Sequence, residues 1–136
     1  MWGHIDAFDP LTGERHWRVP TKYLESPSLL ATGGDLIFGG DMEGSAFALD
    51  ARTGEKLWSY NTGASVTGAS VTYSVNGRQY VAIDSGVGTG VGRRTTNFFP
   101  GSKGHLPQAA SNLFVFALPQ TSNNEAAKQN RSADAK

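Results

Sequence analysis

The chain has 136 residues, which is enough for one ordinary domain, and its 12 Lys and Arg balance its 12 Asp and Glu. This neutral balance argues against a nucleic-acid surface, and no apolar run approaches the length of a membrane-spanning helix. Cysteine is absent, which excludes disulfides, thiolate metal sites and thiol nucleophiles.

Seventeen glycines and short runs of Val, Ile, Phe and Tyr predict an all-β chain with many turns. The strands are expected over 4–9, 14–19, 28–32, 35–40, 45–50, 55–60, 66–73, 78–84 and 112–118. Asn76-Gly77 is a strong hairpin signal between two of them. The 27 residues of 85–111 have no sustained pattern and interrupt the last unit.

The most informative feature is a repeat. Seven positions recur at a fixed offset of 41 residues, and a period of about 40–45 residues is typical of a four-stranded propeller blade. The matched pairs are Gly3 and Gly44, Ala7 and Ala48, Asp9 and Asp50, Thr12 and Thr53, Gly13 and Gly54, Glu14 and Glu55, and Trp17 and Trp58.

We therefore predict a partial β-propeller of about two to two and a half antiparallel blades. Residues 1–20 form the second half of a blade and 21–61 a complete blade. Residues 62–119 form a last blade that lacks its fourth strand, and 120–136 form a polar, disordered tail. Such a chain has open strand edges, so in isolation we expect it to aggregate or to fold only marginally.

The repeated turn has a structural interpretation. Asp9 and Asp50 are expected to accept backbone N–H groups within their turns, which fits a cap better than a catalytic acid. Trp17 and Trp58 are expected to place large rings on the sheet face and to donate the indole N–H to a backbone carbonyl of the neighbouring blade.

The motif Ala-x-Asp-x-x-Thr-Gly-x-x-x-Trp, at Ala7–Trp17 and Ala48–Trp58, resembles the tryptophan-docking motif of the quinoprotein alcohol dehydrogenases. The likeness continues, in family order, through three further stretches and covers about residues 3–119. Those stretches are Leu30–Gly44, Val71–Gly88 and Phe114–Pro119.

The resemblance implies the C-terminal part of an eight-bladed propeller that binds pyrroloquinoline quinone. The whole enzyme would be periplasmic, although the start of this chain does not have the pattern of a signal peptide. It would oxidise an alcohol or related substrate by hydride transfer to the quinone, with Ca²⁺ or a lanthanide as Lewis acid, and pass electrons to an acceptor such as a cytochrome c. Metal ligands and catalytic residues are expected in earlier blades, so none is assigned here, and the isolated chain is expected to be inactive.

Two cofactor-contacting positions of the family fall inside the chain by this resemblance. One aligns with Ser26, where methanol-oxidising relatives hold a tryptophan. The other follows Ser85-Gly86-Val87-Gly88, where relatives often carry Gly-Trp and this chain has Thr89-Gly90. The implied cofactor residues are therefore Ser26, Gly88, Thr89 and Gly90. Both departures remove stacking surface and fit branches other than the methanol oxidisers.

Other candidate sites are weaker. The glycine series of 86–92 does not have nucleotide-loop spacing, and it fits either a plain loop or a loop over the propeller mouth. Arg93-Arg94 fits a solvated loop end or a partner for cofactor carboxylates. His4 and His16 could face each other across a hairpin, but no third metal ligand is evident.

A non-enzymatic alternative remains open. Scaffold lipoproteins of outer-membrane assembly share such blades and dock partners by strand addition. The long insertion over 85–111 and the string from Gly77 to Ala82 favour the enzyme. The coding sequence upstream of Met1 discriminates the two, because acidic metal ligands support the dehydrogenase and a lipobox supports the scaffold. A ring of several short copies is disfavoured because unequal half-blades do not close symmetrically.

Overall fold

The computed structural model describes residues 3–21, 29–86 and 111–119, and these ranges contain strands, turns and connections without a helix. Three antiparallel sheets form, with the strand orders β1-β2, β3-β4-β5-β6 and β7-β8-β9. The strands are β1 (Gly3–Phe8), β2 (Arg15–Thr21), β3 (Leu30–Ala31), β4 (Leu36–Gly40), β5 (Ser45–Asp50), β6 (Lys56–Asn61), β7 (Val71–Val75), β8 (Arg78–Ser85) and β9 (Asn112–Ala117).

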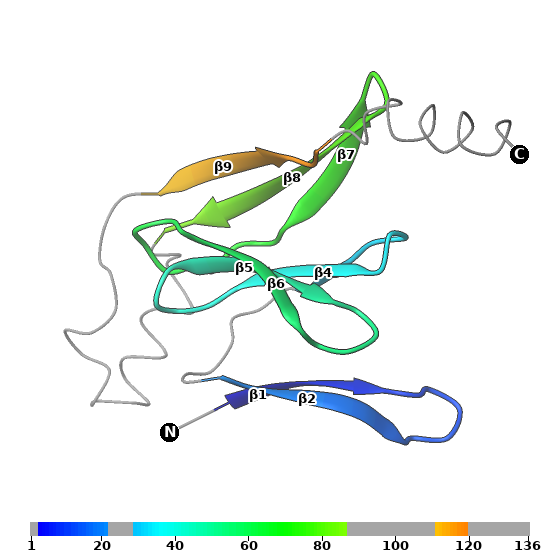
Figure 1. Ribbon diagram of the computed structural model, residues 1–136. Helices are drawn as coiled ribbons and strands as arrows, with labels where there is room; N and C mark the ends of the chain where they lie inside the picture. The colour runs from blue at the N-terminus through cyan, green and yellow to red at the C-terminus, as the bar shows by residue number, and fades with distance from the viewer. Residues whose placement is uncertain (1–2, 22–28, 87–110, 120–136) are drawn as a thin grey trace, which may run out of the picture.

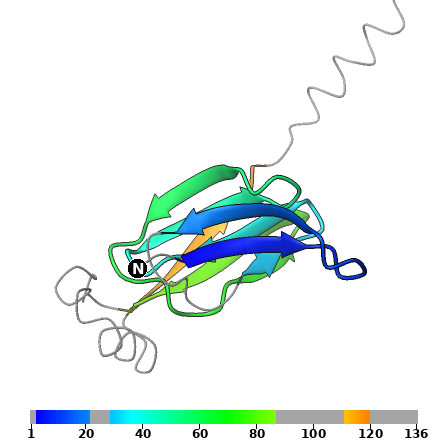
Figure 2. The ribbon, with the colours of Figure 1, turned by 90° about the horizontal axis from the view of Figure 1, so that it is seen from below.

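The three sheets lie one above another in chain order, with the four-stranded sheet between the other two (Figure 1). Seen from below, the strands of the stacked sheets run in similar directions (Figure 2). This is the face-to-face arrangement that buries the apolar face of each sheet against the next.

Two apolar clusters join the sheets. Ile5 of β1 packs with Phe47 and Leu49 of β5, and Trp17 and Val19 of β2 complete this first interface. Because successive strand residues point to opposite faces, β5 also supplies the second interface from its other side.

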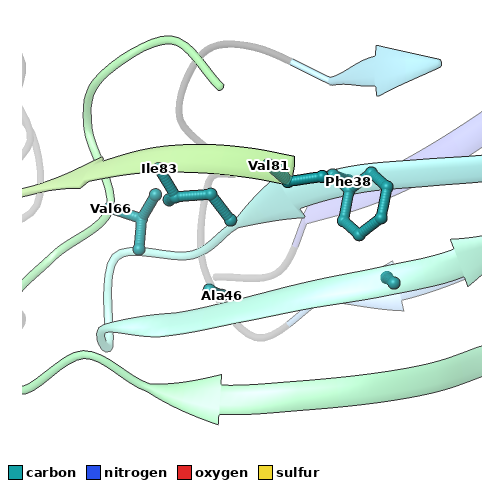
Figure 3. Packing of buried hydrophobic residues seen from close by; sticks show 6 residues of the cluster. Phe38, Ala46, Val66, Val81 and Ile83 are labelled. Carbon is teal, nitrogen blue, oxygen red and sulfur yellow. The ribbon is translucent and has the colours of Figure 1, made fainter. Parts of the chain in front are cut away.

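That second interface lies between the four-stranded sheet and β7-β8-β9. Phe38 and Ala46 face Val81 and Ile83, and Val66 fills the space at one end of the contact (Figure 3). Val81 and Ile83 have no exposed surface, and Val66 is 2% exposed. The middle sheet is thus covered on both faces, as the repeat requires.

The two repeated turns have the same geometry. Asp9 Oδ1 accepts the N–H groups of Leu11 and Thr12 at 2.7 and 3.0 Å. Asp50 Oδ1 accepts those of Arg52 and Thr53 at 2.8 and 3.0 Å. The predicted capping role of both aspartates is confirmed, and the backbone hydrogen bonds lower the pKa of each carboxyl.

Two sequence expectations need correction. The strand expected over 66–73 begins only at Val71, because the preceding residues cross from one sheet to the next. Val66 N donates to Asp41 O at 3.0 Å, which holds this crossing against the middle sheet. The strand expected over 28–32 is only two residues long, Leu30–Ala31, within the part of the chain that the structure describes.

No described residue covers the far face of the last sheet. Val71 and Tyr73 of β7 and Val115 of β9 are 53%, 44% and 50% exposed. They share this face with Tyr80 and Ala82, which lie opposite them in register. An apolar sheet face of this kind is the surface on which a further sheet would pack.

Candidate functional site

The candidate site is the end of the stacked sheets at which β8 finishes and β9 begins. Ser85 and Asn112 are register partners, so the long insertion between them leaves and returns at this one edge. Gly86 N donates to Ser65 O at 2.8 Å, and Thr67 Oγ1 donates to Gly86 O at 2.9 Å. Both backbone groups of Gly86 are therefore held by the connection between β6 and β7.

The chain is tightly packed where the insertion starts. A Cβ atom added at Gly86 would lie 2.6 Å from Ser111 Oγ and 2.7 Å from Ser111 Cα. Neither contact leaves room for a side chain, so this position requires glycine for steric reasons. The result is a narrow neck at which the two ends of the insertion touch.

A buried hydroxyl pair fastens this neck to the middle sheet. Ser85 Oγ lies 2.7 Å from Thr62 Oγ1 and 2.8 Å from Ala64 O. Thr62 Oγ1 in turn lies 2.9 Å from Gly44 O and 2.7 Å from Ala64 O. Each hydroxyl has one proton, so Ser85 can donate to Thr62 while Thr62 donates to a carbonyl. Ser85 is fully buried, and Thr62 is 7% exposed.

The same connection carries a further buried hydroxyl. Ser65 Oγ donates to Met42 O at 2.6 Å, and Ser65 is 4% exposed. Sequence reasoning missed Thr62, Ser65 and Ser85 as members of one network. The available signal was the repeated Ser and Thr among the small residues of 62–70. In the sequence alone this pattern indicates an ordinary polar loop.

The residues that the resemblance implies for the cofactor lie outside the described ranges. Ser26, Gly88, Thr89 and Gly90 are therefore neither placed nor brought together here, and the same holds for Arg93-Arg94. The described residues that flank them are placed. Leu29 contacts the position of Gly39, where a Cβ would lie 2.8 Å from Leu29 Cδ2.

Those flanks leave from the same end of the molecule. Gly39 and Gly40 end β4, and the side chain of Val66 occupies the space that a Cβ at Gly40 would need. Val66 follows Ser65, the residue that holds Gly86. Leu29 and Gly86 therefore mark one common end of two adjacent sheets, and they adjoin the undescribed segments 22–28 and 87–110.

Asp41 is a partly buried carboxylate near this end of the sheets. Burial raises the pKa of Asp41, against the opposing hydrogen bonds from the N–H groups of Ser45 and Glu43. Ser45 N lies 2.8 Å from Asp41 Oδ1, so the carboxylate caps its own turn. No group of three metal-ligating side chains occurs among the residues that the structure describes.

The outer face of the first sheet carries a charged pair. Arg18 Nε and Nη2 donate to Asp6 Oδ1 and Oδ2, both at 2.7 Å, and these hydrogen bonds lower the pKa of Asp6. His4 Nε2 lies 3.3 Å from Asp6 Oδ2. The hypothesis that His4 faces His16 is wrong, because His4 is the register partner of Pro20.

The docking contact of the repeat is present at the first interface. Trp17 Nε1 donates to Ala51 O at 3.0 Å, and this bond joins the first sheet to the middle sheet over 34 positions of sequence. The ring covers Gly54, where an added Cβ would lie 2.8 Å from Trp17 Cε3. The predicted partner, a backbone carbonyl of the neighbouring blade, is confirmed for this tryptophan.

This arrangement of repeated turns, a docked tryptophan and stacked sheets has counterparts among known proteins. Residues 19–81 match the family model described as the β-propeller domain of glucose/ethanol/alcohol dehydrogenases. Over part of its length the chain is similar to quinoprotein alcohol dehydrogenases.

Its relatives include enzymes of several kinds. Over 68% of its length the chain is 41% identical to lupanine 17-hydroxylase (cytochrome c) of a Pseudomonas species, of which it covers 13%. The quinohemoprotein alcohol dehydrogenase of Comamonas testosteroni matches 88% of the chain with a TM-score of 0.68 at 27% identity. A europium-containing methanol dehydrogenase matches 85% with a TM-score of 0.69 at 28% identity.

The match is to a small part of each relative. The chain covers 13% of the hydroxylase, 18% of the Comamonas enzyme and 23% of the methanol dehydrogenase. The predicted fold class, a partial all-β propeller, is confirmed by these neighbours. No helix in the described ranges is long and apolar enough to cross a membrane. The predicted blade boundaries stay predictions.

Proposed function

We propose that this chain is the C-terminal part of a quinoprotein dehydrogenase that oxidises an alcohol or related substrate. The observation that carries the proposal is the docking of Trp17 on the Ala51–Gly54 turn, because it joins the repeats as blades of a ring. The relationship to quinoprotein alcohol dehydrogenases supports the same conclusion. Since the chain covers a small share of its relatives, the activity belongs to a longer protein.

Pyrroloquinoline quinone is the proposed cofactor, and when bound it would supply the hydride-accepting chemistry of an alcohol oxidation. The described residues are not proposed to contact the cofactor; they hold in place the segment that is. The neck at Gly86 and the pair of Ser85 with Thr62 fix the position from which the segment with Gly88, Thr89 and Gly90 departs. Those three residues and Ser26 are proposed to line the cofactor, and no catalytic step is assigned to them.

A metal ion would be held by residues outside this chain. The described residues include no ligand cluster, so they do not fit a metal site by themselves. Ca²⁺ or a lanthanide is proposed for the longer protein, in line with the europium-containing relative. A cytochrome c is the proposed electron acceptor, in line with the name of the lupanine enzyme. A periplasmic location is proposed from the resemblance alone.

The test uses the longest open reading frame that contains this chain. The encoded protein is expressed, supplied with pyrroloquinoline quinone and either Ca²⁺ or a lanthanide, and assayed for alcohol-dependent reduction of an artificial electron acceptor. We expect reduction that requires the quinone, the metal and a primary alcohol together, and none from residues 1–136 alone. A protein that binds no quinone and reduces no dye with any alcohol would refute the proposal.

The same expressed protein also distinguishes a dehydrogenase from the non-enzymatic scaffold. A scaffold would fold into a complete ring without the quinone and would capture partner strands at an exposed sheet edge. A dehydrogenase is expected to gain thermal stability when the quinone is added, because a ligand that binds only the folded state stabilises it. A ring whose melting temperature is unchanged by saturating quinone and metal would favour the scaffold.

A further inference from the structure

The second tryptophan of the repeat lies beside a groove that no described residue covers. Trp58 is half-buried, and the groove beside it has a volume of about 390 Å³. Its walls are apolar side chains of β4, β6 and the residues around β9, among them Leu36, Leu57, Leu118 and Pro119. At the first interface the corresponding space is filled by the Ala51–Gly54 turn, on which Trp17 is seated.

The two interfaces are built alike. Trp17 packs against the cluster that contains Phe47 and Leu49, and Trp58 lines the groove together with Phe116 and Leu118. The rings of Trp58 and Phe116 meet edge to face, with centroids 4.7 Å apart. Each tryptophan therefore meets the same Phe-Ala-Leu segment in the sheet that follows its own.

Register supports this equivalence. Ala48 pairs with Phe38 in the middle sheet, and Ala117 pairs with Tyr80 in the last sheet. Leu118 N donates to Gln79 O at 2.9 Å, so the last sheet continues past Ala117. Leu49 and Leu118 end the two Phe-Ala-Leu segments. Counting on from them, Ala51 corresponds to residue 120 and Gly54 to residue 123.

The sequence at those places suits the same turn. Ser122 occupies the place of Thr53, whose hydroxyl accepts the N–H of Glu55 at 3.2 Å. Asn123 occupies the place of Gly54, which has φ of 75°. Asparagine tolerates this left-handed region, and Asn76 adopts it in this protein with φ of 51°.

We infer that residues 120–123 of this chain seat on Trp58 and fill the groove, with the carbonyl of Gln120 accepting the Trp58 indole N–H. Within the described ranges Trp58 Nε1 has no hydrogen-bond acceptor, whereas Trp17 Nε1 has Ala51 O. Pro119 lines the groove, so the four residues that follow it begin at the right place.

The inference stops at residue 123. Pro119 occupies the position that corresponds to Asp50. Asp50 caps its turn with its carboxylate, and its backbone N–H donates to Glu55 O at 2.8 Å. Proline has neither the carboxylate nor the N–H. A fourth strand paired to β9 is therefore not part of the proposal. The tail predicted to be disordered over 120–136 lies outside the described ranges, and of it the proposal concerns residues 120–123 alone.

Disulfide trapping tests this seating, because the chain has no native cysteine. At the first interface a Cβ at Gly54 would lie 2.9 Å from Val19 Cγ2, and Tyr60 and Asn123 are the corresponding pair at the second. The test variant is Tyr60→Cys with Asn123→Cys. Its matched control is Ser59→Cys with Asn123→Cys, since Ser59 pairs with Phe47 and points to the opposite face of β6.

All variants are made in the complete 136-residue chain and oxidised mildly at low protein concentration, and the bonds are identified by mass spectrometry. The Val19→Cys with Gly54→Cys pair reports whether the first docking contact is formed. We expect the Tyr60 pair to close within one chain about tenfold faster than the Ser59 pair, because seating raises the local thiol concentration. In strong denaturant this difference is expected to vanish.

Three results would overturn the inference. Equal rates for the Tyr60 and Ser59 pairs would mean that residues 120–123 sample both faces. Bonds mainly between two chains would mean that a second copy fills the groove. Failure of the Val19 pair would remove the docking geometry on which the argument rests.

A second measurement avoids new cysteines. Solvent exchange of the Trp58 indole N–H is compared by NMR in chains that end at Asn124 and at Pro119. Exchange is expected to be several-fold faster in the shorter chain because its acceptor is lost. Asn123→Gly should retain slow exchange and Asn123→Val should not, since valine disfavours the left-handed region. Identical exchange in both truncations would also overturn the inference.

Discussion

The docking contact can be isolated by comparing two glycines in equivalent turns. Gly13 and Gly54 have φ of 73° and 75°, so an alanine at either position meets the same backbone strain. They differ in their surroundings. A Cβ at Gly13 has no atom within 4 Å, whereas one at Gly54 would lie 2.8 Å from Trp17 Cε3 and 2.9 Å from Trp17 Cδ2.

The expected magnitudes follow from this difference. Gly13→Ala should cost about 1–2 kcal/mol, the typical penalty of the left-handed conformation for a residue with a Cβ. Gly54→Ala has that penalty and in addition forces the indole away from its seat, which is an overpacking cost of about 1–3 kcal/mol. The effect of alanine on the unfolded chain is the same at both sites and cancels.

The assay is urea unfolding followed by circular dichroism, with trimethylamine N-oxide added to all samples so that a marginal fold reaches its native baseline. Gly54→Ala should lower the free energy of unfolding by about 1–3 kcal/mol more than Gly13→Ala does. In a Trp17→Leu background this excess should shrink, because the two positions are coupled through the ring. Equal losses for the two glycine variants, or an unchanged excess without the indole, would refute the docking argument.

Three further predictions address the network, the turns and the uncovered face. Thr62→Val should lower the free energy of unfolding by about 1–3 kcal/mol, measured by urea titration against the exposed Thr72→Val, because it removes a buried donor. The turn aspartates have a folded pKa below the ordinary 3.8, so their contribution is complete above that pH and is lost as the pH falls through the folded value. In the double variant Asp9→Asn with Asp50→Asn, the urea midpoint of unfolding should fall less steeply as the pH is lowered into the acid range. A fall as steep as in the unmodified chain would count against the role of these two carboxylates. The isolated chain should self-associate through the face that contains Val115, so Val115→Lys should reduce the sedimenting mass, with Lys56→Arg as a neutral control.

The turns were predictable because their hydrogen bonds join residues that are close in sequence. The hydrogen bonds of Asp9 and Asp50 reach only two or three residues ahead, and their chemistry can be inferred from Asp, Thr and Gly alone. The strands could be predicted from alternation and turns. One exception was Val66, an apolar β-branched residue that looks like a strand residue but fills a gap between two sheets.

The candidate site was predictable only in part. The resemblance implied Ser26, Gly88, Thr89 and Gly90 as cofactor residues, and they remain proposals because they lie outside the described ranges. The hydroxyl pair of Ser85 and Thr62 was not predictable, since it joins residues 23 positions apart. Nothing in either local sequence indicates the other, and only the stacking of two sheets makes both hydroxyls buried partners.

The amino-acid sequence by itself determined the blade-sized repeat, its turns and the need for further sheets, because a strand with two apolar faces requires a neighbour on each side. Which surfaces meet was decided by tertiary structure alone. Trp17 reaches Ala51 across 34 residues, and the acceptor is a backbone carbonyl, which every residue has. A group that all residues share has no signature in the sequence, so its role becomes visible only when the sheets are in place.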